Sequence, residues 1–181
     1  PPRSTLFPYT TLFRSLSELG APPAAELVAE LARAAGPAGM IAGQVADMDL
    51  CALSPGGEGL AYIHQHKTAD MIRAAVRMGG LCGGADAATL AALDSYGSAL
   101  GLAFQLIDDL LDVTGEACDI GKTPGKDQKA GKRTYVALLG LDGARRLAAG
   151  HTQSAVDALA PLGSAAQPLR ELAILLSERT R

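Results

Sequence analysis

Three aspartates, Asp108, Asp109 and Asp112, lie within five residues near the middle of the chain, among Leu, Ile and Phe neighbours. On a helix, Asp108 and Asp112 project from one face, one turn apart. Acids this close repel one another unless a cation compensates them. Mg²⁺ suits this spacing, because it keeps several waters and accepts one or two carboxylates plus phosphate oxygens. The alternative is a solvated acidic patch, but the helix dipole disfavours anions in the C-terminal half of a helix. The spacing therefore predicts a Mg²⁺ site.

A basic, glycine-rich segment follows the aspartates and supplies the opposite charge. Glycines allow the backbone to approach an anion closely, and lysines act as point charges for phosphate. Upstream, Lys67 and Thr68 add a cation and a hydroxyl, although such a pair alone is also common on helix surfaces. Acids, lysines and glycines together favour a Mg²⁺–diphosphate ligand. The basic residues of the segment are Lys122, Lys126, Lys129, Lys132 and Arg133.

The elements that position these residues are predicted to be helices. The chain has 34 Ala against 6 Val and 6 Ile, which favours an all-α fold over a β-sandwich or barrel. Apolar residues from Leu90 to Leu111 recur at steps of three and four, which predicts one long, core-facing helix. We expect this helix to begin after an N-cap at Asp86 and to end near Thr114. Other helices are expected over 24–35, 37–50, 59–81, 134–162 with a break near Gly140, and 165–178.

Charge and cysteine content exclude several classes of protein. The net charge of −3 disfavours a nucleic-acid binder held by phosphate contacts. No uninterrupted apolar run reaches the roughly 18 residues that a membrane span requires. The three cysteines are more than 30 residues apart, a spacing typical of neither a disulfide framework nor a zinc site. We therefore expect a cytoplasmic protein with reduced thiols and no membrane span.

The first 15 residues differ from the rest of the chain. Residues 1–15 contain no Ala, hold two of the three Phe, and lack the layout of a signal peptide. They resemble a translated sequencing adapter; a natural disordered tail is the alternative. We expect residues 1–15 to be a non-native, disordered segment and residues 16–181 to form the C-terminal part of one domain.

Four blocks of sequence resemble one enzyme family. With these blocks, the chain is similar to the trans-polyprenyl diphosphate synthases, most closely the bacterial farnesyl diphosphate synthases (geranyltranstransferases). The third block matches the second aspartate-rich motif of that family, and the fourth follows it at the family's spacing. The blocks are GMIAGQVAD (39–47), HQHKT (64–68), GLAFQLIDDLLD (101–112) and GKTPGKDQKAGKRTY (121–135).

The resemblance implies a fold and a reaction. The family fold is an all-α bundle around a deep cavity, usually in a homodimer. The implied reaction joins isopentenyl diphosphate to an allylic diphosphate, dimethylallyl or geranyl, and makes a longer trans-prenyl diphosphate in isoprenoid biosynthesis. Mg²⁺ and basic residues draw off the allylic diphosphate, the double bond of isopentenyl diphosphate attacks the resulting cation, and a proton is lost.

The resemblance also implies roles for individual residues. Asp108 and Asp112 would hold Mg²⁺, and Asp109 would support that metal cluster. Lys67 and Lys122 would bind the allylic diphosphate.

The remaining catalytic and binding roles follow from the same match. Thr68 and Gln105 would form hydrogen bonds around the diphosphate, and Lys132 would help to close the site. Phe104 would flank the reacting prenyl carbons. Two further positions match cavity-lining residues of the family: Gln44 and Asp47.

One expected motif has no counterpart here. The family's first aspartate-rich motif, Asp-Asp-x-x-Asp, does not occur in residues 16–100, nor does the Gly-Lys-x-Arg segment that binds isopentenyl diphosphate. We therefore expect a C-terminal fragment of a prenyl synthase that is inactive by itself.

Two other functions are considered. A class I terpene cyclase also uses acidic motifs and Mg²⁺, but the Gly-Lys segment favours the synthase. A non-catalytic helical Mg²⁺-binding or regulatory subunit would be a complete domain with a natural N-terminus, which the adapter-like residues 1–15 contradict. Of the remaining polar residues, His64 and His66 fit helix-surface or supporting roles better than metal ligation, and Arg73 and Arg77 suggest a solvated helix face.

Overall fold

The computed structural model describes residues 24–48, 57–114 and 134–178, and every regular element within these ranges is helical. This confirms the all-α prediction. The elements are α2 (Ala24–Ala35), α3 (Met40–Met48), α4 (Gly57–His64), the π-helix η2 (Gln65–Ala69), α5 (Asp70–Cys82), α6 (Ala87–Thr114), α8 (Tyr135–Ala158), the 3₁₀ helix η3 (Ala160–Ala166) and α9 (Gln167–Glu178).

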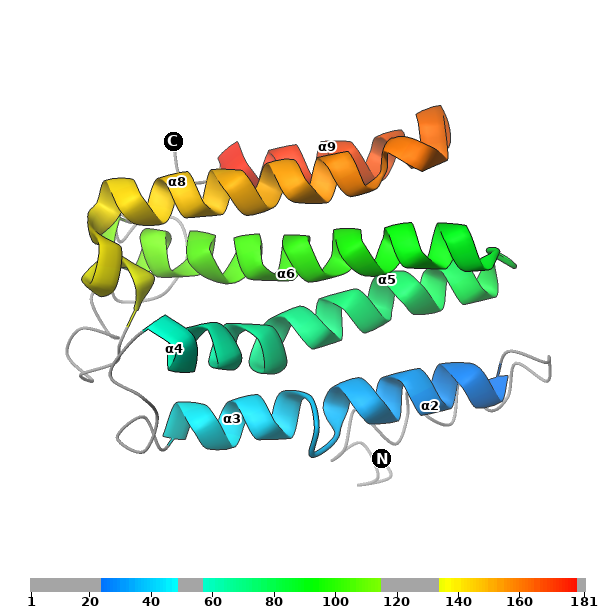
Figure 1. Ribbon diagram of the computed structural model, residues 1–181, viewed down its shortest axis with the longest axis horizontal. Coiled ribbons are helices and arrows are strands. Elements are labelled where there is room, and N and C mark those ends of the chain that lie inside the picture. The colour runs from blue at the N-terminus through cyan, green and yellow to red at the C-terminus, as the bar shows by residue number, and fades with distance from the viewer. Residues whose placement is uncertain (1–23, 49–56, 115–133, 179–181) are drawn as a thin grey trace, which may run out of the picture.

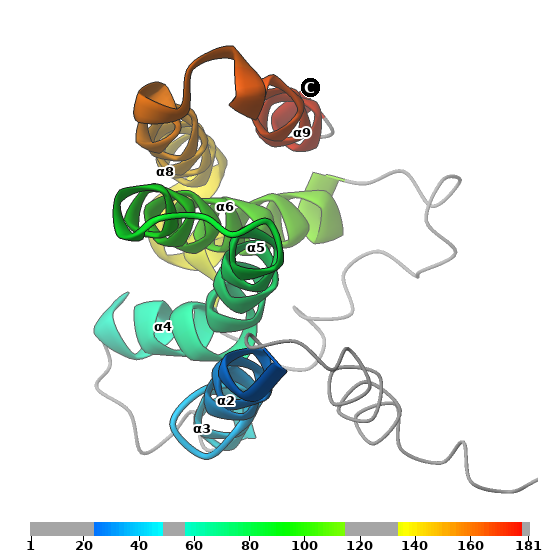
Figure 2. The same ribbon diagram turned by 90° about the vertical axis from the view of Figure 1, so that its right-hand side faces the viewer.

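Successive rows of helices run in opposite directions (Figure 1). The first row is α2 with α3, the second is α4, η2 and α5, and the third is α6. End on, α8 and α9 lie on one side of α6, whereas α2 and α3 lie on the other side (Figure 2). Helix α6 packs against both α5 and α8, so the helix that bears the three aspartates is the central element.

The apolar stripe of α6 faces the core as predicted. Of the stripe, Leu93, Gly97, Leu100 and Ile107 are buried and the remaining members are half-buried: Leu90, Phe104 and Leu111. The helix is continuous from Ala87 to Thr114. Asp86 caps its start, since the Asp86 side chain accepts a hydrogen bond of 2.8 Å from the backbone N–H of Thr89. Of the helices described, α6 is the one whose length and composition would allow a membrane span, and half of its most apolar window is buried inside the bundle.

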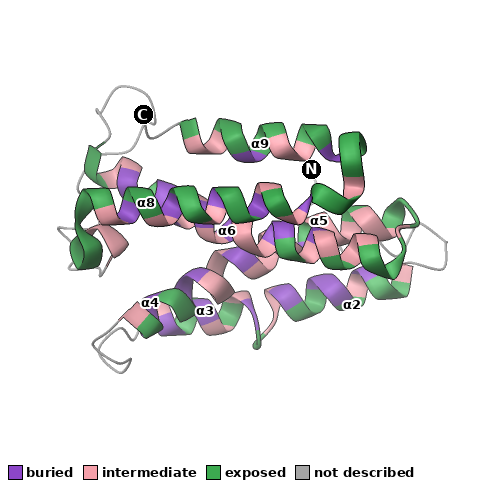
Figure 3. Cartoon of the chain, turned by 45° about the horizontal axis from the view of Figure 1, so that its top comes forward, coloured by how far each residue is buried: buried purple, intermediate pink, exposed green. Residues whose placement is uncertain are grey.

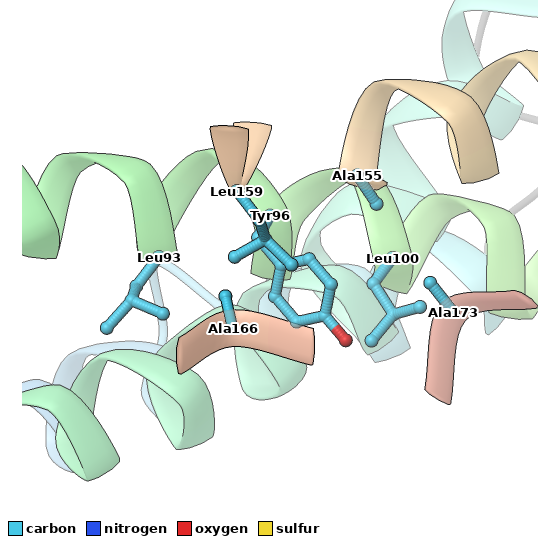
Figure 4. Close-up of a cluster of buried hydrophobic side chains, with 7 residues drawn as sticks. All are labelled: Leu93, Tyr96, Leu100, Ala155, Leu159, Ala166 and Ala173. Atoms are coloured by element: carbon cyan, nitrogen blue, oxygen red, sulfur yellow. The ribbon is translucent and has the colours of Figure 1, made fainter. Parts of the chain in front are cut away.

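The largest buried side chain belongs to Tyr96, at the junction of α6, α8, η3 and α9 (Figure 4). Its hydroxyl donates a hydrogen bond of 2.8 Å to the backbone carbonyl of Leu169, so the polar end of the ring is satisfied inside an apolar cluster. Buried positions line the inner faces of α2, α6 and α8, whereas α9 is mostly exposed (Figure 3). The cluster around Tyr96 consists of Leu93, Leu100, Ala155, Leu159, Ala166 and Ala173.

The structure differs from the predicted elements in three places. The helix expected from residue 37 begins at Met40, and 160–166 forms a 3₁₀ helix. The helix expected over 59–81 contains the π-helix η2, in which each turn holds an extra residue. The break expected near Gly140 is confirmed, because Gly140 has a φ of 70° inside α8, a value that glycine tolerates best.

Candidate active site

Lys67 and Thr68 lie in η2 and contact helices on two sides of it. The Lys67 ammonium Nζ lies 2.6 Å from the Asp47 carboxylate oxygen Oδ2 on α3. The Thr68 hydroxyl donates a hydrogen bond of 3.0 Å to the Gln105 carbonyl Oε1 on α6. The π-helix therefore links four of the predicted site residues, and π-turns inside α-helices are frequent at functional sites.

Two glycines allow the neighbouring helices to approach η2 this closely. A Cβ atom at Gly43 of α3 would lie 2.2 Å from the backbone nitrogen of Lys67. A Cβ atom at Gly101 of α6 would lie 2.4 Å from the Cα atom of Ala69. Both distances are far inside van der Waals contact with backbone atoms, so side chains at these positions would force the helices apart. The glycines of the first and third sequence blocks thus set the spacing of the site.

The aspartates of α6 divide between two faces of the helix. Asp108 is exposed and Asp112, one turn further along the same helix, is half-buried. Asp109 is only 6% exposed and faces the core. Within the described ranges, no group of three or more His, Cys, Asp or Glu side chains is placed to hold a metal ion.

Asp109 lies where α4, α6 and α8 meet. Its Oδ2 atom accepts a hydrogen bond of 3.3 Å from the backbone N–H of Tyr135, at the start of α8. The same oxygen is 3.7 Å from Nε2 of His64, at the end of α4. The rings of His64 and Tyr135 pack edge to face with centroids 5.2 Å apart.

His64 is neutral at physiological pH. Burial lowers the pKa of its imidazole to about 4, with a further contribution from the nearby Lys67 ammonium that outweighs the opposing effect of Asp47. The prediction that His64 has a supporting role agrees with this environment, but its partner Asp109 could not be identified from the sequence, because the two residues are 45 positions apart.

His66 has a different environment from His64. Its Nδ1 atom lies 2.8 Å from Oδ2 of Asp70, and the Gln65 amide donates a hydrogen bond of 2.8 Å to the other oxygen of the same carboxylate. The Tyr62 ring packs against the imidazole with a centroid distance of 4.2 Å. These contacts fit the predicted helix-surface role.

The other predicted site residues are more dispersed. Phe104 is half-buried on α6, next to Gln105, and Gln44 is exposed on α3. Lys122 and Lys132 lie outside the described residues, as does the 1–15 segment.

A second charged cluster joins α2, α5 and α6 away from this site. Glu30 is 5% exposed, and its carboxylate pairs with Arg33 and Arg73 at 2.8 Å and with Arg77 at 3.5 Å. Asp94 of α6 also pairs with Arg73, at 3.1 Å, and with Arg77. The interpretation of Arg73 and Arg77 as a solvated face is therefore wrong, because both guanidinium groups bridge three helices.

Residues 4–158 match the sequence profile of one family, described as polyprenyl synthetase. The chain belongs to this family. The helical fold is the one that the sequence resemblance implied.

Individual polyprenyl synthetases are similar over most of the chain. Farnesyl diphosphate synthase of Geobacillus stearothermophilus is 48% identical over 136 residues, which are 71% of this chain and 43% of the relative. The Escherichia coli (strain K12) farnesyl diphosphate synthase is 44% identical, over 77% of this chain and 48% of the relative. The chain thus spans about half the length of these curated relatives.

Solved structures of relatives are similar to this chain in both fold and sequence. The geranyltransferase of Helicobacter pylori, in a complex with magnesium and isoprenyl diphosphate, superposes with a TM-score of 0.77 at 32% identity. The match covers 94% of this chain and 56% of that one.

Proposed function

We propose that this chain is part of a prenyltransferase that joins isopentenyl diphosphate to dimethylallyl or geranyl diphosphate, and so extends a trans-prenyl chain in isoprenoid biosynthesis. The observation behind this proposal is the contact of Lys67 with Asp47 and of Thr68 with Gln105, which lies on α6, the helix that bears the aspartate pair. The relatives named farnesyl diphosphate synthase support the same activity. Family membership disfavours a terpene cyclase and a non-catalytic Mg²⁺-binding or regulatory subunit.

Asp108, Asp109 and Asp112 are the proposed metal-site residues, with Asp109 supporting the other two. Exposed and half-buried carboxylates one turn apart fit Mg²⁺, which accepts one or two carboxylates and takes its other oxygens from water and phosphate. The Helicobacter pylori neighbour is described with magnesium and isoprenyl diphosphate. Bound Mg²⁺ would neutralise the diphosphate oxygens as the leaving group gains charge.

Lys67 is proposed to bind the allylic diphosphate together with Lys122. An ammonium group has three N–H donors, and Asp47 accepts one of them. Asp47 therefore orients the Lys67 side chain and leaves two N–H donors for the diphosphate. Such preorganised charge stabilises the developing diphosphate anion.

Thr68 and Gln105 are proposed to form hydrogen bonds around the diphosphate. Gln105 accepts from Thr68 through its oxygen, so its amide group retains two N–H donors. Phe104, the neighbour of Gln105, is proposed to flank the prenyl carbons, while Lys132 would help to close the site against water. Gln44 and Asp47 are proposed to line the cavity.

Calorimetric titration of inorganic diphosphate in the presence of Mg²⁺ tests the proposed site. We expect wild type to bind and Asp108→Ala to lose binding, because the metal loses a carboxylate. Asp142→Ala, at an exposed position on α8, is the matched control and should bind as wild type does. Equal binding by all three proteins would contradict the proposal.

Turnover is expected to require more than this chain. An assay with radiolabelled isopentenyl diphosphate, geranyl diphosphate and Mg²⁺ should give no product with the 181 residues alone. The first aspartate-rich motif is absent from 16–100, and removal of even one stabilising contact typically costs about 10²–10³ in rate. Turnover close to that of a farnesyl diphosphate synthase would contradict this expectation.

The full-length protein is proposed to act in the cytoplasm as a homodimer. Ile41, Val45 and Met48 of α3 are 47%, 59% and 88% exposed and follow one another at helical spacing, so they form an apolar stripe on the surface. Sedimentation equilibrium should give a dimer that Val45→Glu converts to monomer, and a wild-type monomer at all concentrations would contradict this.

Cys82 is a free, exposed thiol, as a reducing compartment permits.

A further inference from the structure

We infer that His64 is a positioning residue: with Asp109, it holds the start of α8 against α6 and α4, and so fixes the spacing between Lys67 and the outward-facing aspartates. This inference rests on the proposed function, because Lys67 and the aspartates are the groups proposed to bind Mg²⁺–diphosphate.

The geometry brings three elements to one oxygen atom. Oδ2 of Asp109 accepts the N–H of Tyr135 at 3.3 Å and lies 3.7 Å from Nε2 of His64. The side chains of His64 and Asp109 are 5% and 6% exposed, so solvent does not compete for this carboxylate. The junction is at the end of the molecule where α6 ends and α8 begins (Figure 1).

The chemistry explains why an imidazole is found there. Among the described residues, Nδ1 of His64 has no hydrogen-bond partner although it is buried. An unpartnered buried nitrogen lowers stability, so an aromatic hydrocarbon of similar size would fill the same space at lower cost. The other edge of the imidazole faces the buried carboxylate of Asp109, with Nε2 3.7 Å from Oδ2, so the ring dipole and the carboxylate interact electrostatically, at a distance longer than a hydrogen bond.

The connection to the site follows from positions along the chain. Asp109 is the neighbour of Asp108 and lies less than one turn from Asp112 on the same helix. His64 precedes Lys67 by three residues, at the junction of α4 and η2. Any movement of His64 relative to Asp109 therefore changes the separation between the cationic and the acidic half of the site.

Three substitutions in the 181-residue chain test this inference: His64→Phe, His64→Gln and Asp109→Asn. Phe keeps the aromatic packing but removes Nε2, whereas the amide of Gln can place a nitrogen near the same position. His151→Phe, on a half-buried histidine of α8, is the matched control. The two readouts are hydrogen exchange of the Tyr135 amide, by NMR, and the calorimetric affinity for inorganic diphosphate with Mg²⁺.

We expect His64→Phe to fold, to speed exchange of the Tyr135 amide and to weaken diphosphate binding by about tenfold, the lower end of the loss seen when partners of metal ligands are removed. His64→Gln should restore most of both properties, and His151→Phe should change neither. His64→Phe and Asp109→Asn should be non-additive, because they remove the same contact.

Unchanged exchange and affinity in His64→Phe, or additive effects in the double variant, would overturn the inference and leave His64 as a packing residue. Should His64→Phe fail to fold, Asp109→Asn still decides, because the inference requires faster exchange of the Tyr135 amide in this variant at unchanged global stability, and wild-type exchange would overturn it. A wild type that binds no diphosphate would instead refute the proposed function, and the exchange readout would still test the junction.

Discussion

The two charged regions of this protein differ in how their charges are paired. In the cluster formed by α2, α5 and α6, Glu30 and Asp94 share Arg73 and Arg77, and each charge faces an opposite charge. At the other end of the bundle, Asp108 is exposed and pairs with none of the described residues. The charges of the first region are paired within the protein, whereas Asp108 in the second region faces solvent.

This difference distinguishes charges that stabilise the fold from charges that are available to bind a ligand. A buried carboxylate such as Glu30 is tolerated only because several donors surround it, so removing one partner should damage the fold. Exposed carboxylates such as Asp108 contribute little to the fold and remain available for a metal ion. The contrast leads to four predictions, ordered from the largest expected effect on stability to the smallest.

Glu30→Ala should lower the free energy of unfolding by about 4 kcal/mol, because it leaves two partly buried guanidinium groups with one carboxylate between them. Urea denaturation followed by circular dichroism measures this loss. Glu26→Ala, one turn earlier on the exposed face of α2, should change stability by less than about 0.5 kcal/mol. Similar losses of unfolding free energy in the two variants would contradict the distinction between the paired cluster around Glu30 and the exposed surface.

Acid should weaken the fold through His64. The pKa of its imidazole is about 4 in the folded protein, against an ordinary value of 6.5 for histidine, so the unfolded chain binds the proton first as the pH falls. The neutral imidazole therefore contributes its full stability above pH 6.5, and this contribution falls as the pH drops from 6.5 towards 4, by about 3 kcal/mol in total.

The charged and titratable groups around His64 are Lys67, Asp47, Asp109 and the Tyr135 hydroxyl. Between pH 6.5 and 4 the urea midpoint of wild type should fall relative to that of His64→Gln, because the amide does not titrate. Parallel pH profiles for the two proteins would contradict the assignment to His64.

Gly101→Ala should cost about 2 kcal/mol, because the new methyl group would meet the backbone of Ala69 and separate α6 from η2. Gly150→Ala is the matched control in an exposed part of α8, where an added Cβ atom meets nothing within 4 Å, and it should stabilise by about 0.5–1 kcal/mol. Thermal melts compare the two, and a stabilised Gly101→Ala would show that the helices do not touch there.

Asp108→Ala should leave the unliganded protein within about 0.5 kcal/mol of wild type, because an exposed carboxylate has little to lose. Mg²⁺ with diphosphate should raise the melting temperature of wild type but not of this variant. A large loss of stability without ligand would mean that Asp108 belongs to the fold and not to the site.

Helices with a regular apolar spacing could be predicted from the sequence, whereas contacts between residues far apart in the chain could not. The apolar spacing from Leu90 to Leu111 predicted α6, and Asp86 predicted its start. The spacing of apolar residues does not reveal the π-turn at Lys67, because the chain is α-helical on both sides of it and one wider turn hardly changes the pattern. Glu30 and Arg73 are 43 residues apart, and nothing local to either sequence position indicates the other.

The π-helix also has a consequence for how the length of this chain can vary. Each residue of an α-helix adds about 100° of rotation and 1.5 Å of rise. Deleting any one residue of Gln65–Ala69 would let the segment relax to a regular α-helix, and α4 would keep roughly its direction relative to α5, because the π-turn already holds one extra residue. The same one-residue deletion in the regular turns of α5 would instead rotate every residue before it by about 100°.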